Sequence, residues 1–199
     1  PLNVALSPAL YERVRRAAAE ADIPLADLDP LRPWAVAMAL DAATLPPEEG
    51  EGDALALAGA DMVIETSLPV GRRREALDTP RLLETAFASL SQAAPGEGQG
   101  LLGEILDDLP GRTLDLTTQI AWADGDTAPM IAELDQLRTD APVLYAAMFD
   151  ARNRAWMEAL TRMMRTERRV VVVVGAGHMI GDAGLPTLLR QAGFTVEGP

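Results

Sequence analysis

The chain lacks cysteine and lysine altogether, and it contains one histidine and few aromatic residues. Without cysteine it can form neither disulfides nor thiolate metal sites. No apolar run approaches the roughly 20 residues that a transmembrane helix needs, so the sequence predicts no transmembrane segment. The formal net charge is −13. Because an acidic surface repels phosphate backbones, nucleic acid is not expected as a partner.

The 199 residues are 48% hydrophobic, which is enough for one substantial core, and we expect a single domain over residues 1–199. With few aromatics, Leu, Ala, Val and Met must fill the interior, and this composition favours helices. Ser7 and Pro8 are typical of an N-cap and first turn, and Thr79-Pro80 should open another helix. Apolar spacing predicts further helices over 34–43, 54–68, 101–122, 126–137, 142–165 and 185–192.

Five consecutive valines, Val170 to Val174, precede a glycine turn. A β-branched run bounded by charge and glycine is typical of a fully buried strand. Two shorter segments also favour strands. The predicted fold is therefore α/β and helix-rich, with a small central sheet whose strands lie near 73–77, 170–175 and 194–197.

The only histidine, His178, stands directly after the turn Gly175-Ala-Gly177. In open α/β sheets, ligands gather at the carboxyl ends of strands. There an imidazole can bind a metal or move a proton. The alternative is that His178 merely caps or packs against the following helix. A dinucleotide-binding interpretation of the glycines is disfavoured, because no second mononucleotide-binding half follows.

Several short motifs, in order along the chain, resemble the TraB/GumN family, also called TIKI-like. The clearest is Gly175-Ala-Gly-His178, which is similar to the family's C-terminal Gly-x-x-His signature. Asp78-Thr79 is similar to the family's Glu-Thr, with the carboxylate shortened by one methylene. The other matching segments are Arg32-Pro33-Trp34, Gly59-Ala60-Asp61, Trp122-Ala-Asp-Gly125-Asp126, Arg152-Asn153 with Trp156, and Gly193-Phe194-Thr-Val196.

The resemblance implies a fold distantly similar to erythromycin-esterase and haem-binding ChaN-like proteins, and an activity similar to metal-dependent peptidases. The family's site pairs two Gly-x-x-His motifs with acidic residues, and only the second motif is present here. The sequence therefore resembles the C-terminal two-thirds of the family domain, lacking its N-terminal strand and first Gly-x-x-His, or a divergent member that has lost half of its site.

By this resemblance, His178 is a metal ligand or general base, Asp78 supplies a ligating carboxylate, and Arg152 steadies an oxyanion. The remaining candidates, Gly175, Gly177 and Asn153, would contact the substrate. The metal would be a divalent ion such as Mn, Co or Zn, incompletely held by this chain alone.

Two other functions stay open at this stage. The same pocket could bind a peptide, a small molecule or haem without chemistry, with His178 as the ligand. Alternatively, the Met- and Ala-rich helices could serve self-association into a homo-oligomer, with His178 purely structural. The resemblance implies export to the periplasm, and the absence of cysteine is equally compatible with the cytoplasm.

Overall fold

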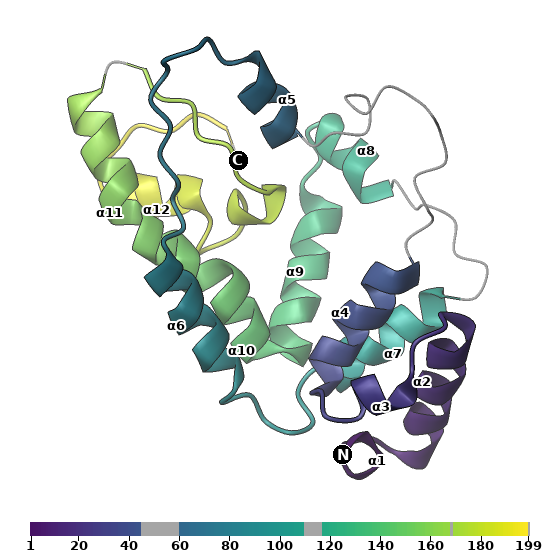
Figure 1. Ribbon diagram of the computed structural model, residues 1–199. Helices are drawn as coiled ribbons and strands as arrows, with labels where there is room; N and C mark the ends of the chain where they lie inside the picture. The colour runs from purple at the N-terminus through teal and green to yellow at the C-terminus, as the bar shows by residue number, and fades with distance from the viewer. Residues whose placement is uncertain (45–59, 110–116, 168, 199) are drawn as a thin grey trace. The chain divides into compact units, whose positions relative to one another are not determined.

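The computed structural model describes residues 1–44, 60–109, 117–167 and 169–198, and Figure 1 shows their arrangement into helices and irregular segments. None of these described residues belongs to a strand. The chain forms two compact units: unit 1 comprises Pro1–Pro47 and Ser89–Ala146, and unit 2 comprises Glu48–Ala88 and Ala147–Pro199. Among the described helices, none has the length and apolar character needed to cross a membrane.

The helices are divided between the two units, each of which comprises two separate stretches of the chain. Unit 1 contains α1 (Leu2–Ala5), α2 (Pro8–Glu20), α3 (Leu25–Leu28), α4 (Pro33–Thr44), α7 (Gln99–Asp108), α8 (Thr117–Ala123), α9 (Ala128–Asp140) and α10 (Pro142–Tyr145). Unit 2 contains α5 (Ala60–Ser67), α6 (Pro80–Leu90, whose last two residues fall in unit 1), α11 (Ala151–Thr166), the 3₁₀ turn η2 (Ala176–His178) and α12 (Leu185–Gln191). The π-helical turn η1 (Ala146–Asp150) leads into α11.

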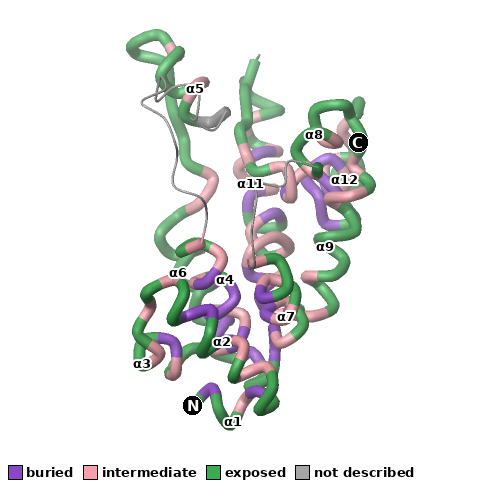
Figure 2. The backbone as a smooth tube through the Cα atoms, turned by 90° about the vertical axis from the view of Figure 1, so that its right-hand side faces the viewer, coloured by how far each residue is buried: buried purple, intermediate pink, exposed green. Residues whose placement is uncertain are grey.

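Unit 1 is built around α2, α4 and α7, which pack against one another. Their inward faces carry side chains with no exposed surface, and Figure 2 shows the buried stretches on these helices. Helix α2 begins as the sequence predicts, because the Ser7 side chain accepts a hydrogen bond from the Leu10 amide at 3.2 Å. The innermost residues are Leu2, Val14, Val36, Ala37, Leu40 and Leu102.

The other predicted helices are confirmed where the structure describes them, with one change. Thr79 caps α6 through the Leu82 amide at 3.2 Å, and Asp126 accepts from the Ala128 amide at 2.9 Å before α9. The long helix predicted over 142–165 is divided by η1, whose wider turn shifts the faces of the residues that follow. Parts of the predicted helices 54–68 and 101–122, and the motif residue Gly59, lie outside the described residues.

In unit 2, α11 and α12 pack against each other around a small core. Its buried members are Trp156, Leu160 and Leu185, and the partly buried Leu77 and Val174 pack against them. Leu77 and Val174 belong to extended segments without regular secondary structure. These segments therefore reach the face of α11 that carries the candidate site.

The predicted α/β fold with a central sheet is wrong for the described residues. The segments 73–77, 170–175 and 194–197 contain no strand, and the valine run is not buried: Val171 is 76% exposed and Val172 is 42% exposed. Valine favours extended backbone wherever it stands, but a buried strand also needs neighbours for its N–H and C=O groups. The local pattern identified the extended backbone and could not specify such neighbours.

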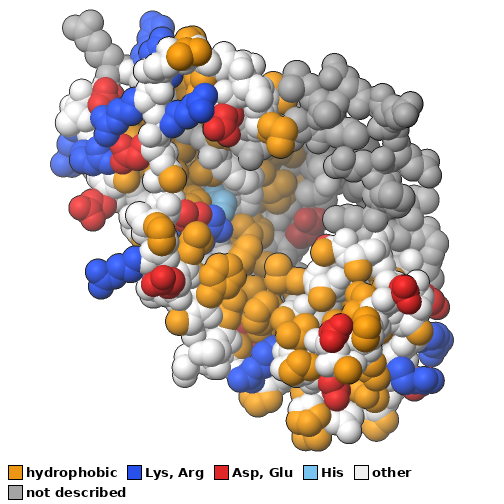
Figure 3. All heavy atoms as spheres, in the orientation of Figure 1, with side chains coloured by type: hydrophobic (Ala, Val, Ile, Leu, Met, Phe, Trp, Pro, Cys, Tyr) orange, Lys and Arg blue, Asp and Glu red, His pale blue; other side chains and the backbone are white. Residues whose placement is uncertain are grey.

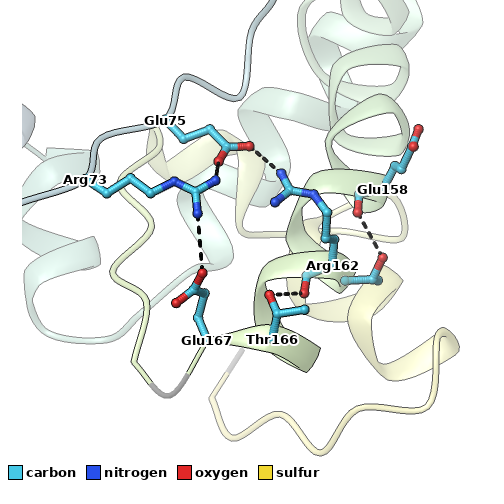
Figure 4. Close-up of polar contacts among 7 residues, drawn as sticks. Arg73, Glu75, Glu158, Arg162, Thr166 and Glu167 are labelled. Atoms are coloured by element: carbon cyan, nitrogen blue, oxygen red, sulfur yellow. Dashed lines mark hydrogen bonds and ion pairs between the residues drawn. The ribbon is translucent and has the colours of Figure 1, made fainter.

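Side-chain ion pairs hold one of these extended segments in place of a strand ladder. Figure 4 shows Glu75 between two arginines, Arg73 on its own segment and Arg162 on α11. Arg73 also reaches Glu167, just beyond α11, at 3.4 Å. These pairs are largely exposed and each stabilises the fold weakly. They hold the segment beside α11, and Asp78 lies three residues further along this segment.

Candidate functional site

The loop that carries His178 joins the valine run to α12. After Gly175 the chain makes the 3₁₀ turn η2, closed by a hydrogen bond from the His178 amide to the Gly175 carbonyl at 2.9 Å. This turn directs the imidazole toward α11, where the side chain is 94% buried. Figure 3 shows part of the histidine, in pale blue, still visible at the surface.

Asn153 on α11 fixes the imidazole from one side. This amide is 1% exposed, and its Nδ2 donates to the Ala183 carbonyl at 2.8 Å and, more weakly, to the His178 carbonyl at 3.4 Å. Because Nδ2 is used in this way, Oδ1 faces His178 Nδ1 at 2.7 Å and must accept a hydrogen bond from an Nδ1–H group. We therefore assign the proton of the neutral ring to Nδ1. Nε2 then carries a lone pair, and it bonds to no residue that the structure describes.

Two aromatic rings clamp the imidazole. The ring centroid of Trp156 lies 4.6 Å from that of His178, and the Phe149 centroid lies 5.2 Å away on the π-helical turn η1. Both ring pairs are tilted, the arrangement that aromatic pairs prefer over a face-to-face sandwich. The ring of His178 is therefore held by packing as well as by Asn153.

Asp78 connects this clamp to Arg152. Its Oδ1 accepts from Trp156 Nε1 at 3.0 Å and from Arg152 Nε at 3.2 Å, and its Oδ2 accepts from Arg152 Nη2 at 2.7 Å. Arg152 also donates to the Met148 carbonyl at 3.0 Å and stands over the Trp156 ring at 4.9 Å. Burial alone would raise the pKa of Asp78, but the hydrogen bonds and the charge of Arg152 hold it below its ordinary value.

The electrostatic surroundings keep His178 neutral. Burial and the nearby Arg152 guanidinium lower the pKa of His178 to about 4, against the weaker opposing effect of Asp78. At neutral pH the ring is therefore uncharged, and the lone pair on Nε2 is available to a ligand.

The structure brings most of the sequence-predicted residues together. Asp78, Arg152, Asn153 and His178 form one connected group in unit 2, although Asp78 reaches His178 only through Trp156. The sequence did not single out Phe149 as a contact of His178. Helical spacing could not reveal that contact, because it depends on the extra residue of the π turn.

The two predicted glycines differ in what their positions require. At Gly177 an added Cβ would lie 2.7 Å from Phe149 Cε1, so close approach to this ring excludes a side chain. At Gly175 an added Cβ would meet only His178 Cδ2, at an ordinary 3.9 Å, and the backbone angle φ is −59°. Gly175 therefore occupies a conformation that other residues also adopt.

This difference gives a first prediction. Gly177→Ala should lower the free energy of unfolding by about 1–3 kcal/mol, because the Phe149 ring must move out of the clamp. Gly175→Ala is the matched control and should change it by less than about 0.5 kcal/mol. Urea unfolding followed by circular dichroism measures both. Equal losses in the two variants would contradict the close approach of Gly177 to Phe149.

The strongly shifted pKa of a buried, oriented imidazole beside a carboxylate–guanidinium pair makes this cluster a candidate functional site. The chain matches the TraB/PrgY/gumN family over residues 1–198, and it belongs to that family. This confirms the resemblance given by the sequence motifs. Neither the curated proteins nor the solved structures contain a significant match to the chain.

Proposed function

We propose that the chain is a hydrolase of the TraB/PrgY/gumN family, of the metal-dependent, peptidase-like kind, with Nε2 of His178 as its central ligand atom. The observation that carries the proposal is the pairing of Nδ1 with Asn153, which leaves the Nε2 lone pair free. A histidine that binds metal through one ring nitrogen donates the other N–H to a fixed acceptor in this way.

The low pKa of His178 bears on the two roles that the residue could have, metal ligand or general base. A general base works best when its pKa lies near the working pH, whereas the pKa of His178 is about 4. Such a ring is a weak base at pH 7, and no proton has to leave Nε2 before a cation binds there. This favours a ligand over a general base.

The described residues supply part of a metal site. They contain no group of three or more His, Asp or Glu side chains placed to hold an ion together. Nε2 of His178 would be one ligand, whereas both carboxylate oxygens of Asp78 are engaged by Arg152 and Trp156. The chemistry that a divalent ion supplies in such a site is activation of water for attack on a carbonyl.

Paramagnetic titration of the full chain tests the proposal. With a single histidine, the ring signals of His178 are unambiguous in NMR spectra. We expect Mn²⁺ or Co²⁺ to broaden them, and we expect any metal-dependent hydrolysis of a mixed peptide library to be lost in His178→Ala. Ring signals whose line widths are unchanged by both ions, or hydrolysis that persists in His178→Ala, would contradict the proposal. Absorbance typical of histidine-bound haem would favour the non-catalytic binding alternative.

A further inference from the structure

We infer that Trp156 is the positioning residue that sets the orientation of His178, and that Asp78 and Arg152 influence this orientation through Trp156. This inference rests on the proposed function for its catalytic meaning. Its structural content stands on the contacts between these four side chains.

The first step concerns the guanidinium. A guanidinium that stabilises an oxyanion needs free N–H groups that point at the oxyanion. In Arg152 the Nε, Nη1 and Nη2 atoms all donate within unit 2, to Asp78 and to the Met148 carbonyl. Three of its five N–H groups are therefore engaged within unit 2, and two of these three hold the Asp78 carboxylate.

The second step concerns the carboxylate. Of its roughly four acceptor positions, Asp78 uses two to receive Arg152 and one to receive the indole N–H of Trp156. Most buried indole N–H groups have such a partner. Asp78 therefore fixes the direction in which the Nε1 edge of the Trp156 ring points.

The third step connects the indole to the reactive nitrogen. Trp156 is 3% exposed and its ring lies 4.6 Å from the imidazole of His178. Asn153 restrains Nδ1, and the ring packs against Phe149 and, at the shorter centroid distance, against Trp156. A change in the orientation of the indole would therefore change the tilt of the imidazole and the direction of Nε2.

The experiment follows the His178 ring signals in the full chain at pH 7.5, without added metal. Trp156→Phe keeps an aromatic face and removes only the N–H donor and the second ring. We expect its His178 ring signals to shift and broaden, and Asp78→Asn to do the same, because the new amide nitrogen would face the donors of Arg152. If Asp78 affects His178 only through Trp156, the double variant Asp78→Asn/Trp156→Phe should show no larger change than Trp156→Phe alone.

Trp34→Phe is the matched control. Trp34 Nε1 is buried and has no partner among the described residues, so the same chemical change in unit 1 should leave the His178 signals as they are. Circular dichroism confirms that each variant folds. If Trp156→Phe does not fold, Asp78→Asn tests the same series of contacts without altering the aromatic core.

Unchanged His178 signals in Trp156→Phe would overturn the inference. So would an Asp78→Asn variant that weakens Mn²⁺ binding about tenfold or more while the ring signals stay as in the parent chain, because Asp78 would then act directly as a ligand. Shifted ring signals in a chain that neither binds metal nor hydrolyses peptides would support the positioning role and contradict the proposed function. Failure of the inference and failure of the function are thus distinguishable.

Discussion

Replacing Asn153 by Leu should lower the free energy of unfolding of unit 2 by about 3 kcal/mol. The side chain is 1% exposed, and leucine has nearly its shape but no polar atoms. The Ala183 carbonyl and the Nδ1–H of His178 would lose their partners while remaining buried. Each buried polar group left without a partner costs about 1–3 kcal/mol.

The chain offers a direct control and a local probe for this measurement. Asn3 is the only other asparagine and is exposed, so Asn3→Leu should change stability by less than about 0.5 kcal/mol. Trp156 is the only tryptophan of unit 2. In a background with Trp34 and Trp122 replaced by Phe, its fluorescence reports urea unfolding of unit 2 alone. A loss below about 1 kcal/mol in Asn153→Leu would contradict the hydrogen bonds assigned to Asn153.

The second large effect is expected in the titration of His178. Arg152→Gln removes the charge that helps to lower the pKa of this imidazole and leaves the opposing charge of Asp78 in place. The pKa of His178 should therefore rise from about 4 toward its ordinary value of 6.5, by at least about one unit. The shift should stop short of 6.5 because the ring stays buried.

NMR titration of the single histidine measures this pKa directly. Arg154→Gln is the matched control, because this arginine is exposed on the same helix and does not contribute to the shift of His178. It should leave the pKa of His178 near 4. Equal pKa values in the Arg152→Gln variant and the parent chain would mean that burial alone sets the protonation of His178.

The same depressed pKa makes stability depend on pH. The folded chain holds His178 neutral, whereas the unfolded chain binds a proton below about pH 6.5. The contribution of neutral His178 to the free energy of unfolding is fully present above pH 6.5 and is lost as the pH falls toward 4. A difference between 6.5 and about 4 corresponds to about 3 kcal/mol. His178→Phe, which cannot bind the proton, should flatten this part of the pH profile.

The sequence predicted the helices better than it predicted their assembly. Caps such as Ser7 and Thr79 are local, since one side chain meets an amide three residues away. Sheet formation depends on partners distant in the chain, and the valine run carries no information about them. The π turn before α11 also escaped prediction, because one inserted residue changes the helical faces without any distinctive residue type.

The candidate site was partly visible in the sequence. Motif resemblance identified Asp78, Arg152, Asn153 and His178, and all four lie in one cluster. Their contacts could not be predicted. Only the structure shows that Trp156 stands between Asp78 and the imidazole, and that Gly177 is required by Phe149 rather than by the backbone turn.

The protonation of His178 is the most direct test of this account. Nitrogen NMR of the ¹⁵N-labelled chain at pH 7 distinguishes the two neutral tautomers from the imidazolium. The account predicts a neutral ring with its proton on Nδ1 and a lone pair on Nε2. A proton on Nε2, or a charged ring at pH 7, would contradict the roles assigned to Asn153 and to Nε2 as the ligand atom.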